Sequence, residues 1–300
     1  MRGLMARSVA TFRPNDPLTQ GELSDLIAAL TDQPPRPVAD PSAPVTMAQL
    51  DARLVRTLDL GGEATSFSDA ASAAGVRPPA RFGTEVVARL LGLRTNHPAG
   101  QDDLERLPND PAPRAEAAYS VAQLLSLSDW QKTEVENAAA SFVLPTLTPW
   151  QQRVLATAVK FIGYPYVWGG EFERPQSPYG AQPQGGFDCS GFAWRVYKLQ
   201  VYPGAPQLVN TLRGRTAAAM AGEVPRRTRI KLARLAPADL MFFGPGGPRT
   251  QPAQVDHVGI YLGNGWLIHS SRYGVALEQV RGWFSTRLAW GRRPLAEAGL

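Results

Sequence analysis

The chain has 300 residues, 44% of them hydrophobic, so it can bury a sizeable core, and its length favours two domains. A single cysteine excludes an intrachain disulfide and any two- or four-cysteine metal site. No apolar run approaches the roughly 18 to 20 residues needed to cross a bilayer, and residues 1–10 are too short and too charged for the apolar core of a signal peptide.

Charge divides the chain unevenly. Residues 1–143 hold 13 basic and 18 acidic side chains, a net of −5, whereas residues 144–300 hold 18 and 8, a net of +10. A basic half attracts nucleic acid, an anionic membrane surface or an anionic polymer. Its basic residues lack interleaved aromatics and any nucleic-acid motif, so we expect no nucleic-acid partner.

The first half contains a faint internal repeat. The Pro-Asn-Asp-Pro sequence at residues 14–17 recurs 94 positions later at residues 108–111, and a third copy begins at residues 45–50. In the first two copies a proline-rich turn precedes apolar residues at helical spacing, which predicts a loop that leads into an amphipathic helix. Repeats of this size are typical of stacked helical units that share one core.

These units resemble S-layer homology modules, short helical repeats that anchor exported bacterial proteins to secondary cell-wall polymers. The helix of such a module opens with a Thr-Arg-Ala-Glu-like signature. One copy keeps the arginine, as Arg114, while Gln20 and Met47 stand at the matching positions. The resemblance implies an anionic cell-wall polymer as a partner of this half. The alternative is a helical scaffold that binds no polymer.

The domain boundary is expected near residues 144–148. Residues 31–45 are rich in proline and predict an extended linker inside the first domain. A helix is expected over 129–142, and the next begins after Thr148, with Pro149 at its first position and Gln151 completing a capping box. We therefore predict a helical domain over 1–143 and a second domain over 144–300.

Cys189 stands where a glycine-rich loop leads into an apolar pattern at helical spacing, formed by Phe192, Val196 and Leu199. Unpaired amides and the helix dipole at such a position favour the thiolate and lower the pKa of a thiol from about 8.5. A lone cysteine is more often an inert buried thiol, so its position alone does not identify a nucleophile.

Two histidines lie downstream on two β-rich runs that flank a Gly-Asn-Gly turn, which predicts a hairpin. A two-residue loop would send His257 and His269 to opposite faces. A three-residue loop, residues 263–265, would pair Gly259 with His269 and put both histidines on one face. We predict the three-residue form. Together with Cys189 the histidines would then supply the nucleophile, base and orienting group of covalent acyl transfer.

The second half resembles the NlpC-type family of papain-like cysteine peptidases, which cut peptidoglycan stem peptides. The resemblance rests on five motifs in order: GYPYVWGG (163–170), FDCSGF (187–192), LAPADLMFF (235–243), DHVGIYLGNG (256–265) and LIHSS (267–271). It implies Cys189 as the nucleophile, His257 as the base and His269 as the third polar residue.

The same resemblance implies that Tyr166 orients substrate or stabilises the oxyanion. It also implies that Asp188 and Ser190 line the site on the amino-terminal side of the scissile bond, where an acid can pair with a substrate amine. Two features depart from the family pattern. Ala238 replaces a glycine in a Pro-Gly-Asp-Leu turn, and the chain inserts 16 residues at 171–186. This insertion and the loop at 244–254 are expected to shape the cleft.

We therefore predict an α+β papain-like domain, with helices packed on an antiparallel sheet, preceded by an all-α repeat domain. The predicted function is that of a peptidoglycan hydrolase, an endopeptidase that cuts the amide after γ-D-glutamate in a stem peptide or muropeptide through a thioester. Neither a cofactor nor a metal is expected, because HExxH and glycine-rich phosphate motifs are lacking. His97 is expected to be a surface residue.

Two other functions stay open at this point. One is a wall-binding protein whose second half grips stem peptide without cutting it, and the other is an amidase or acyltransferase that uses the same thiol. By resemblance the protein is extracellular or associated with the cell wall. Since no signal peptide is visible, cytoplasmic recycling of released peptides is the other location considered.

Overall fold

A computed structural model describes residues 5, 11–94, 104, 106–175, 182 and 184–300, and His97 lies outside these. The chain divides into two compact units. The helical unit comprises residues 1–68, 80–95 and 106–141, and the sheet unit comprises residues 69–79, 96–105 and 142–300. No helix in the described ranges is long and apolar enough to cross a membrane.

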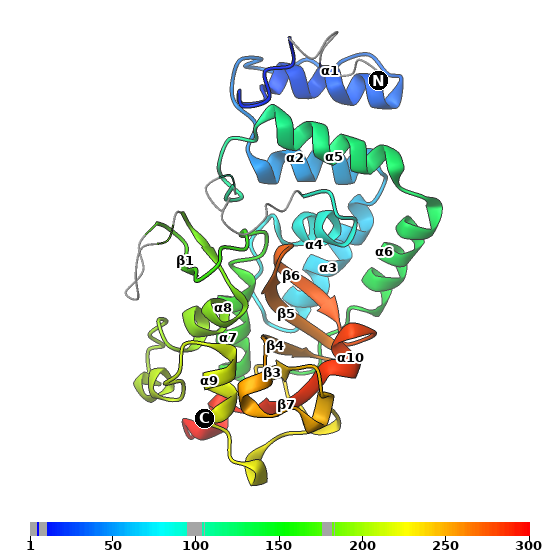
Figure 1. The fold of residues 1–300 in the computed structure, drawn as a ribbon. Helices are drawn as coiled ribbons and strands as arrows, with labels where there is room; N and C mark the ends of the chain where they lie inside the picture. Colours follow the sequence, from blue (N-terminus) through cyan, green and yellow to red (C-terminus); the bar gives the residue numbers. More distant parts are fainter. Residues whose placement is uncertain (1–4, 6–10, 95–103, 105, 176–181, 183) are drawn as a thin grey trace. The chain divides into compact units, whose positions relative to one another are not determined.

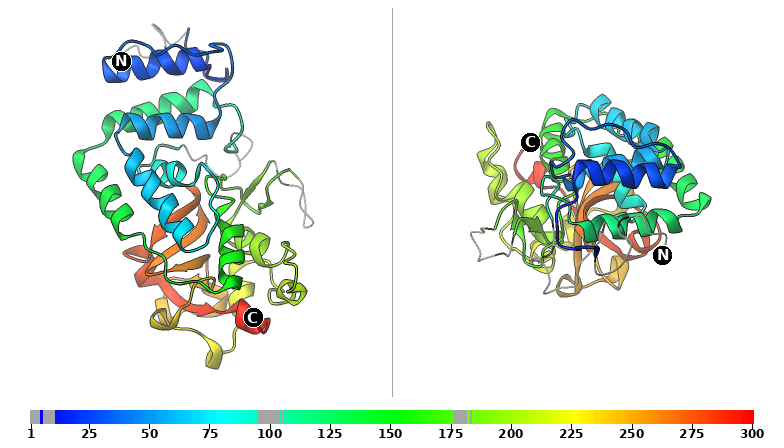
Figure 2. Two further views of the ribbon diagram at one scale, coloured as in Figure 1. Left: turned by 180° about the vertical axis from the view of Figure 1, so that it is seen from behind. Right: turned by 90° about the horizontal axis from the view of Figure 1, so that it is seen from above.

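The helical unit is built from short amphipathic helices. Thr19 and Thr46 each cap a helix, and Glu22 and Gln49 return a side-chain bond to complete two capping boxes. Figures 1 and 2 show α1, α2 and α5 lying next to one another. The helices are α1 (Gln20–Thr31), α2 (Met47–Thr57), α3 (Gly61–Ala73, which continues into the sheet unit), α4 (Phe82–Leu90), α5 (Arg114–Ser126) and α6 (Asp129–Ser141).

The three repeated segments meet in a closed ring of backbone hydrogen bonds. The amide of Leu18 donates to the carbonyl of Ala112, Ala112 donates to Val45, and Val45 donates to Leu18, each at 2.8 Å. All three side chains are fully buried. The ring gives the starts of α1, α2 and α5 equivalent positions around an approximate threefold axis. Residues 20, 47 and 114 therefore correspond to one another.

The sheet unit holds the second fold. Its helices are α7 (Pro149–Val159), α8 (Cys189–Tyr197), α9 (Ala217–Gly222), α10 (Trp283–Arg287) and α11 (Pro294–Glu297). Its strands are β1 (Glu171–Phe172), β2 (Gly186–Phe187), β3 (Leu240–Phe243), β4 (His257–Gly263), β5 (Trp266–Ser271), β6 (Gly274–Gln279) and β7 (Leu288–Arg292). Single 3₁₀ turns are η3 (Pro206–Asn210), η4 (Arg226–Thr228), η5 (Leu232–Arg234), η6 (Gly247–Arg249) and η7 (Pro252–Gln254).

Five antiparallel strands form the central sheet in the order β6-β5-β4-β3-β7. Helix α8 packs against β4 and β5 (Figure 1), and Phe192 and Trp194 of α8 are buried. A second cluster on the sheet, around Phe243 and Tyr261, packs against Phe284 of α10. The predicted fold class is confirmed: the first half is helical, and the second half packs helices on an antiparallel sheet.

Candidate active site

Cys189 is the first residue of α8, as predicted. Asp188 caps this helix by accepting a hydrogen bond from the amide of Gly191 at 2.5 Å. Gly191 admits no side chain, since a Cβ there would lie 1.8 Å from the carbonyl oxygen of Gly170. Cys189 is half-buried, and its sulfur faces the backbone amides of Ser190 and Val258. The nucleophile candidate therefore lies beside the first residues of β4.

The hairpin has the predicted register but a different turn. Ile260 pairs with Ile268, so Gly259 lies opposite His269, and both histidines share one face of the sheet. The prediction of a three-residue loop is wrong. Asn264 and Gly265 form a two-residue turn with positive φ angles of 48° and 79°, and a bulge between Tyr261 and Gly263 restores the register.

His257 and His269 are in direct contact. Nε2 of His257 lies 2.8 Å from Nδ1 of His269, and the ring planes are nearly perpendicular, at 88°. For His257 to take a proton from a thiol on Nδ1, its Nε2 must carry a proton and donate to His269. His269 then carries its own proton on Nε2, a buried atom that finds no acceptor among the described residues. The pair thus has one arrangement suited to a general base.

Burial sets the protonation of the site. It raises the pKa of Cys189 to about 12, an effect that Asp188 strengthens and that the amides of Val258 and Ser190 and the charge of Arg215 oppose. Burial lowers the pKa of His257 to about 4 and holds that of His269 well below its usual value. The expected lowering of the thiol pKa by the helix start is thus outweighed by burial. At neutral pH the site holds a thiol and two neutral imidazoles.

The thiol of Cys189 and the imidazole of His257 are not hydrogen-bonded to each other. No hydrogen bond links the sulfur of Cys189 to His257 among the described residues. Catalytic hydrogen bonds are often long in a free enzyme and tighten when substrate binds. Proton transfer to His257 would therefore accompany substrate binding and would not precede it.

Arg215 forms hydrogen bonds with several residues around Cys189. Its guanidinium donates to both carboxylate oxygens of Asp188, at 3.1 and 3.3 Å, to the hydroxyl of Ser190 at 2.8 Å and to Glu171 at 2.6 Å. It also donates to the carbonyl oxygen of Gly170 at 3.0 Å. The polar atoms of Asp188 and Ser190 are thus already paired within the protein.

Tyr166 lies on a loop that runs beside the segment leading to Cys189. The amide of Val167 donates to the carbonyl of Phe187, and the amide of Asp188 donates to Gly170, so residues 165–170 follow the chain that leads to Cys189. Tyr166 is half-buried between these contacts, while Trp168 is 73% exposed. The ends of the predicted insertion pair as β1 and β2, and residues 176–181 and 183 lie outside the described part.

Aromatic side chains surround His257 and His269. The ring centroids of Phe243 and Trp283 lie 5.7 and 5.9 Å from that of His257, and Phe284 lies 5.1 Å from His269. Trp283 is 49% exposed. Sequence reasoning missed these residues and also Arg215. The only available signal for Arg215 was that two acids, Glu171 and Asp188, flank the predicted site and would need a cation once buried.

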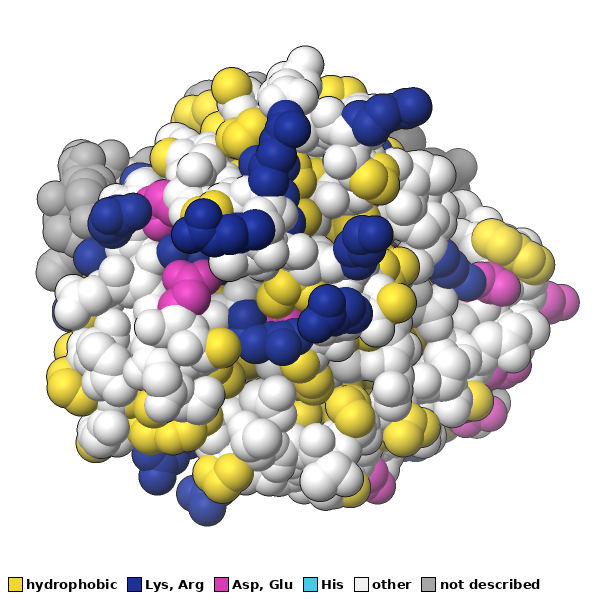
Figure 3. Space-filling model, turned by 90° about the horizontal axis from the view of Figure 1, so that it is seen from below, with side chains coloured by type: hydrophobic (Ala, Val, Ile, Leu, Met, Phe, Trp, Pro, Cys, Tyr) yellow, Lys and Arg dark blue, Asp and Glu magenta, His cyan; other side chains and the backbone are white. Residues whose placement is uncertain are grey.

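The sheet unit carries the basic charge predicted for the second half. Arg226 and Arg227 on η4 and Lys231 and Arg234 around η5 are exposed. Figure 3, which views the molecule from below, shows Lys and Arg side chains gathered on one face with few acidic ones between them. Within the described residues no group of three His, Cys, Asp or Glu side chains is arranged to hold a metal ion.

Comparison with known proteins identifies the second half. Residues 163–293 match the NlpC/P60 family. Murein DD-endopeptidase MepH of Escherichia coli is 35% identical over 117 residues, which cover 39% of this chain and 35% of that protein. Gamma-D-glutamyl-L-lysine dipeptidyl-peptidase of Bacillus subtilis is 30% identical over 125 residues, 42% of this chain and 33% of that protein.

The NlpC/p60 domain of the peptidoglycan hydrolase SagA is 29% identical, covers 48% of this chain and 97% of that chain, and has a TM-score of 0.33. The chain spans about a third of the length of the two curated relatives named above. Residues 163–293 thus form an NlpC/P60 domain. The comparisons give no support for S-layer homology repeats in the helical half.

Proposed function

We propose that this chain, through its NlpC/P60 domain at residues 163–293, is a cysteine endopeptidase that hydrolyses an amide bond in the peptide stems of peptidoglycan. The observation that carries the proposal is the site itself: Cys189 opens α8 beside β4, and His257 contacts His269 at 2.8 Å on the same sheet. A nucleophile, a base and an orienting group are the parts that thioester chemistry requires.

The reaction proceeds in two halves. The sulfur of Cys189 attacks the scissile carbonyl carbon while Nδ1 of His257 accepts the thiol proton, and the tetrahedral oxyanion forms near the backbone amide of Cys189 and the hydroxyl of Tyr166. Collapse breaks the C–N bond, His257 returns the proton to the leaving amine, and a thioester remains. Water, deprotonated by His257, then attacks the thioester and releases the carboxylic acid and the thiol. His269 accepts the Nε2 proton of His257 in a hydrogen bond throughout.

We further propose the amide after γ-D-glutamate as the bond cut. One relative is named a γ-D-glutamyl-L-lysine peptidase, which supports this choice, whereas another is named a DD-endopeptidase. Asp188 and Ser190 are the proposed contacts on the amino-terminal side. Because Arg215 already pairs with Asp188, a substrate ammonium would have to share the carboxylate. A free amino terminus on the stem peptide therefore gains less binding energy from Asp188 than it would gain from an unpaired carboxylate.

The names of the relatives also support an envelope or extracellular location, where intact peptidoglycan is the substrate. An anionic cell-wall polymer as partner of the helical half is a separate proposal, which rests on the resemblance of its repeats.

Purified sacculi and defined muropeptides test the peptidase proposal. Wild type should release new amino and carboxyl ends that mass spectrometry assigns to one bond, and Cys189→Ala should leave the substrate intact while its circular dichroism stays unchanged. Cys189→Ser should retain only a trace of activity, because a hydroxyl is a weaker nucleophile. The same product profile from wild type and Cys189→Ala would refute the peptidase function.

A second candidate function is binding of stem peptide without cleavage. The observation that favours it is the absence of a hydrogen bond between Cys189 and His257 in the described structure, together with the raised pKa of the thiol. This candidate predicts that wild type and Cys189→Ala bind a stem peptide with the same affinity and that neither yields product. Product formation by wild type alone decides in favour of the peptidase.

A further inference from the structure

An acid and a cation lie next to His257 and take no part in the proposed chemistry. Asp256 directly precedes His257, and its Oδ2 forms an ion pair with Nη2 of Arg287, the last residue of α10. The side chain of Asp256 is 53% exposed and that of Arg287 is 23% exposed. The ion pair is therefore partly open to solvent beside the proposed base.

The backbone holds both residues at one end of β3. The amide of Asp256 donates to the carbonyl of Phe243 at 3.0 Å, and the amide of Gly244 donates to the carbonyl of Arg287 at 2.9 Å. Burial has the largest influence on the pKa of His257, but the charge of Asp256 also raises that pKa and the charge of Arg287 also lowers it. Both charges thus lie close enough to His257 to meet a substrate that is bound there.

Trp283 lies between the cation and the base. The Cζ atom of Arg287 lies 4.7 Å from the centre of the Trp283 ring, and the centre of the same ring lies 5.9 Å from that of His257. A cation over an aromatic face is attracted by the electrons of the ring. This contact and the ion pair with Asp256 hold the guanidinium in place before a substrate arrives.

Both members of the pair keep hydrogen-bonding capacity. Within the described residues the carboxylate of Asp256 bonds through Oδ2, and its Oδ1 has no partner. Nε of Arg287 is buried and also finds no partner there. A carboxylate can accept from an ammonium group, and a guanidinium can donate to a carboxylate. The pair therefore suits a ligand that carries an ammonium and a carboxylate close together.

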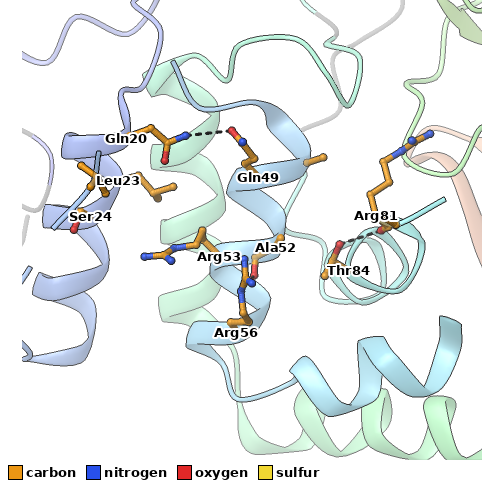
Figure 4. A pocket seen from close by; sticks show the side chains of 12 residues that line it. Gln20, Leu23, Ser24, Gln49, Ala52, Arg53, Arg56, Arg81 and Thr84 are labelled. Atoms are coloured by element: carbon orange, nitrogen blue, oxygen red, sulfur yellow. Dashed lines mark hydrogen bonds between the residues drawn. The ribbon is translucent and has the colours of Figure 1, made fainter. Parts of the chain in front are cut away.

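Arginines of the helical unit are presented differently. Arg53 and Arg56 line a cavity of about 500 Å³ in that unit (Figure 4), and no acid belongs to its described lining. That cavity offers a ligand charge of one sign. Asp256 and Arg287 offer both signs side by side, so the ligand that they suit is a zwitterion.

The proposed reaction determines which residue of the substrate meets this pair. His257 returns a proton to the leaving amine, so the residue that carries this amine lies on the side of His257. For the bond proposed above, that residue follows γ-D-glutamate, and in peptidoglycan stems it is a diamino acid. The side chain of lysine ends in an ammonium group alone. The side chain of diaminopimelate ends in an ammonium and a carboxylate on one carbon.

We propose that Asp256 and Arg287 form a subsite for the zwitterionic end of diaminopimelate, with the substrate carboxylate on Arg287 and the substrate ammonium on Asp256. The two residues determine specificity and take no part in bond breaking. The inference rests on the proposed function, since it assumes cleavage after γ-D-glutamate, and it adds the identity of the next residue. A stem with lysine at that position lacks the carboxylate and leaves Arg287 paired with Asp256 alone.

Four muropeptides that differ only at this residue test the proposal on wild type. They carry meso-diaminopimelate, its amide at the side-chain carboxylate, 2-aminopimelate, which lacks the second ammonium, or L-lysine. The kcat/KM for diaminopimelate should exceed that for the amide and for lysine by at least about 10-fold, mainly through KM. It should exceed that for 2-aminopimelate by at least about threefold. Equal kcat/KM for diaminopimelate and its amide would overturn the proposal, and this measurement needs no variant to fold.

Variants assign the preference to the pair. Arg287→Gln should lower kcat/KM for the diaminopimelate muropeptide by about 10-fold through KM, and it should change kcat/KM for the lysine muropeptide by less than about twofold. The matched control Arg234→Gln removes an exposed cation from the same unit and should change neither value by more than about twofold. Equal losses on both muropeptides in Arg287→Gln would show a structural role and would contradict the subsite.

Binding measurements separate a failure of the subsite from a failure of the peptidase. Cys189→Ala cannot form a thioester, but it should bind the diaminopimelate muropeptide at least about 10-fold more tightly than the lysine muropeptide, and adding Arg287→Gln should remove this difference. If wild type cuts neither muropeptide while this binding preference is present, the proposed function fails and the subsite stands. If wild type cuts both equally and Cys189→Ala binds both equally, the peptidase stands and the subsite fails.

Discussion

The two units of this protein each bury a cluster of titratable side chains, and the clusters differ in how their charge is handled. In the helical unit, Arg94 pairs with Asp51 at 2.9 Å and approaches Glu85 at 4.0 Å, and Arg89 approaches Glu85 at 3.9 Å. In the sheet unit, the cluster consists of Cys189, His257 and His269. The first cluster holds charges of both signs, whereas the second stays neutral at pH 7.

The difference shows that burial of titratable groups does not by itself mark an active site. In the first cluster, arginine charge offsets much of the cost of desolvating Asp51. In the second, burial outweighs the charges of Arg215 and Asp256, raising the pKa of the thiol and lowering that of His257, so neither is charged until a substrate lowers the cost. Cys189 and His257 are also partly exposed, whereas Asp51 and Glu85 are fully buried. Access and the lack of a direct ion pair to Cys189 or His257 among the described residues together distinguish the candidate site from the first cluster.

The largest effect is expected from removal of His257, the proposed base. His257→Gln should lower kcat/KM on muropeptide by about 10³- to 10⁴-fold, or about 4 to 5 kcal/mol, because no other described side chain is placed to accept the thiol proton. The melting temperature should stay within about 2 °C of wild type, because Cys189, His257 and His269 form no ion pair with one another. If the variant melts at a much lower temperature but its folded fraction keeps a high kcat/KM, His257 is structural.

In the helical unit, by contrast, removal of a buried titratable side chain should lower stability. Arg94→Met leaves Asp51 as a buried carboxylate without its partner and should lower the free energy of unfolding of this unit by about 3 kcal/mol. The value lies at the low end for broken buried pairs, because Asp51 can take up a proton. Amide hydrogen exchange of α2 and α4 reports the loss. Arg53→Met, which removes an arginine without an ion pair, is the matched control and should cost less than about 0.5 kcal/mol.

Sequence patterns predicted the parts of the site that local rules determine. The start of α8 at Cys189 follows from helix periodicity, and the shared face of the histidines follows from strand alternation. The predicted turn type was wrong, because a bulge at Leu262, between Tyr261 and Gly263, adds the residue that the predicted loop would have supplied. The predicted loop and the observed turn with its bulge give the same strand register. The prediction that both histidines share one face of the sheet was therefore still correct.

The features that the sequence did not predict depend on long-range packing. Arg215 is 27 positions from Asp188, and nothing in its local pattern marks it among 18 basic residues of this half. The raised pKa of Cys189 results from tertiary burial, which the helix start alone does not predict. The cyclic hydrogen bonds of Leu18, Val45 and Ala112 show equivalence of three segments whose sequences have diverged. The roles of Tyr166, Asp188 and Ser190 stay predictions from resemblance.

A smaller effect concerns pH and the helical unit. Burial and the charge of Asp51 raise the pKa of Glu85 to about 7, above its usual value near 4.5. The folded state therefore holds a proton that the unfolded chain releases above pH 4.5. Stability from this group is full below pH 4.5 and is lost as pH rises to about 7, by roughly 2 to 3 kcal/mol. Glu85→Gln should remove this slope in unfolding experiments between pH 4.5 and 7.5, and an unchanged slope would assign it to other groups.

The smallest effect tests whether the sheet cluster works by hydrogen bonding and not by charge. His269→Asn keeps an acceptor near Nε2 of His257 and should lower kcat/KM by about 10-fold or less, whereas His269→Leu removes the acceptor and should cost more, up to about 100-fold. In both variants the acid limb of the pH profile should stay below pH 6, because burial and not His269 depresses the pKa of His257. His269→Asp places a carboxylate beside His257, as in the helical unit, and should move the acid limb to higher pH. If the acid limb rises equally in the asparagine variant, the charge of a protonated His269 controls the base, and the contrast between the two clusters is lost.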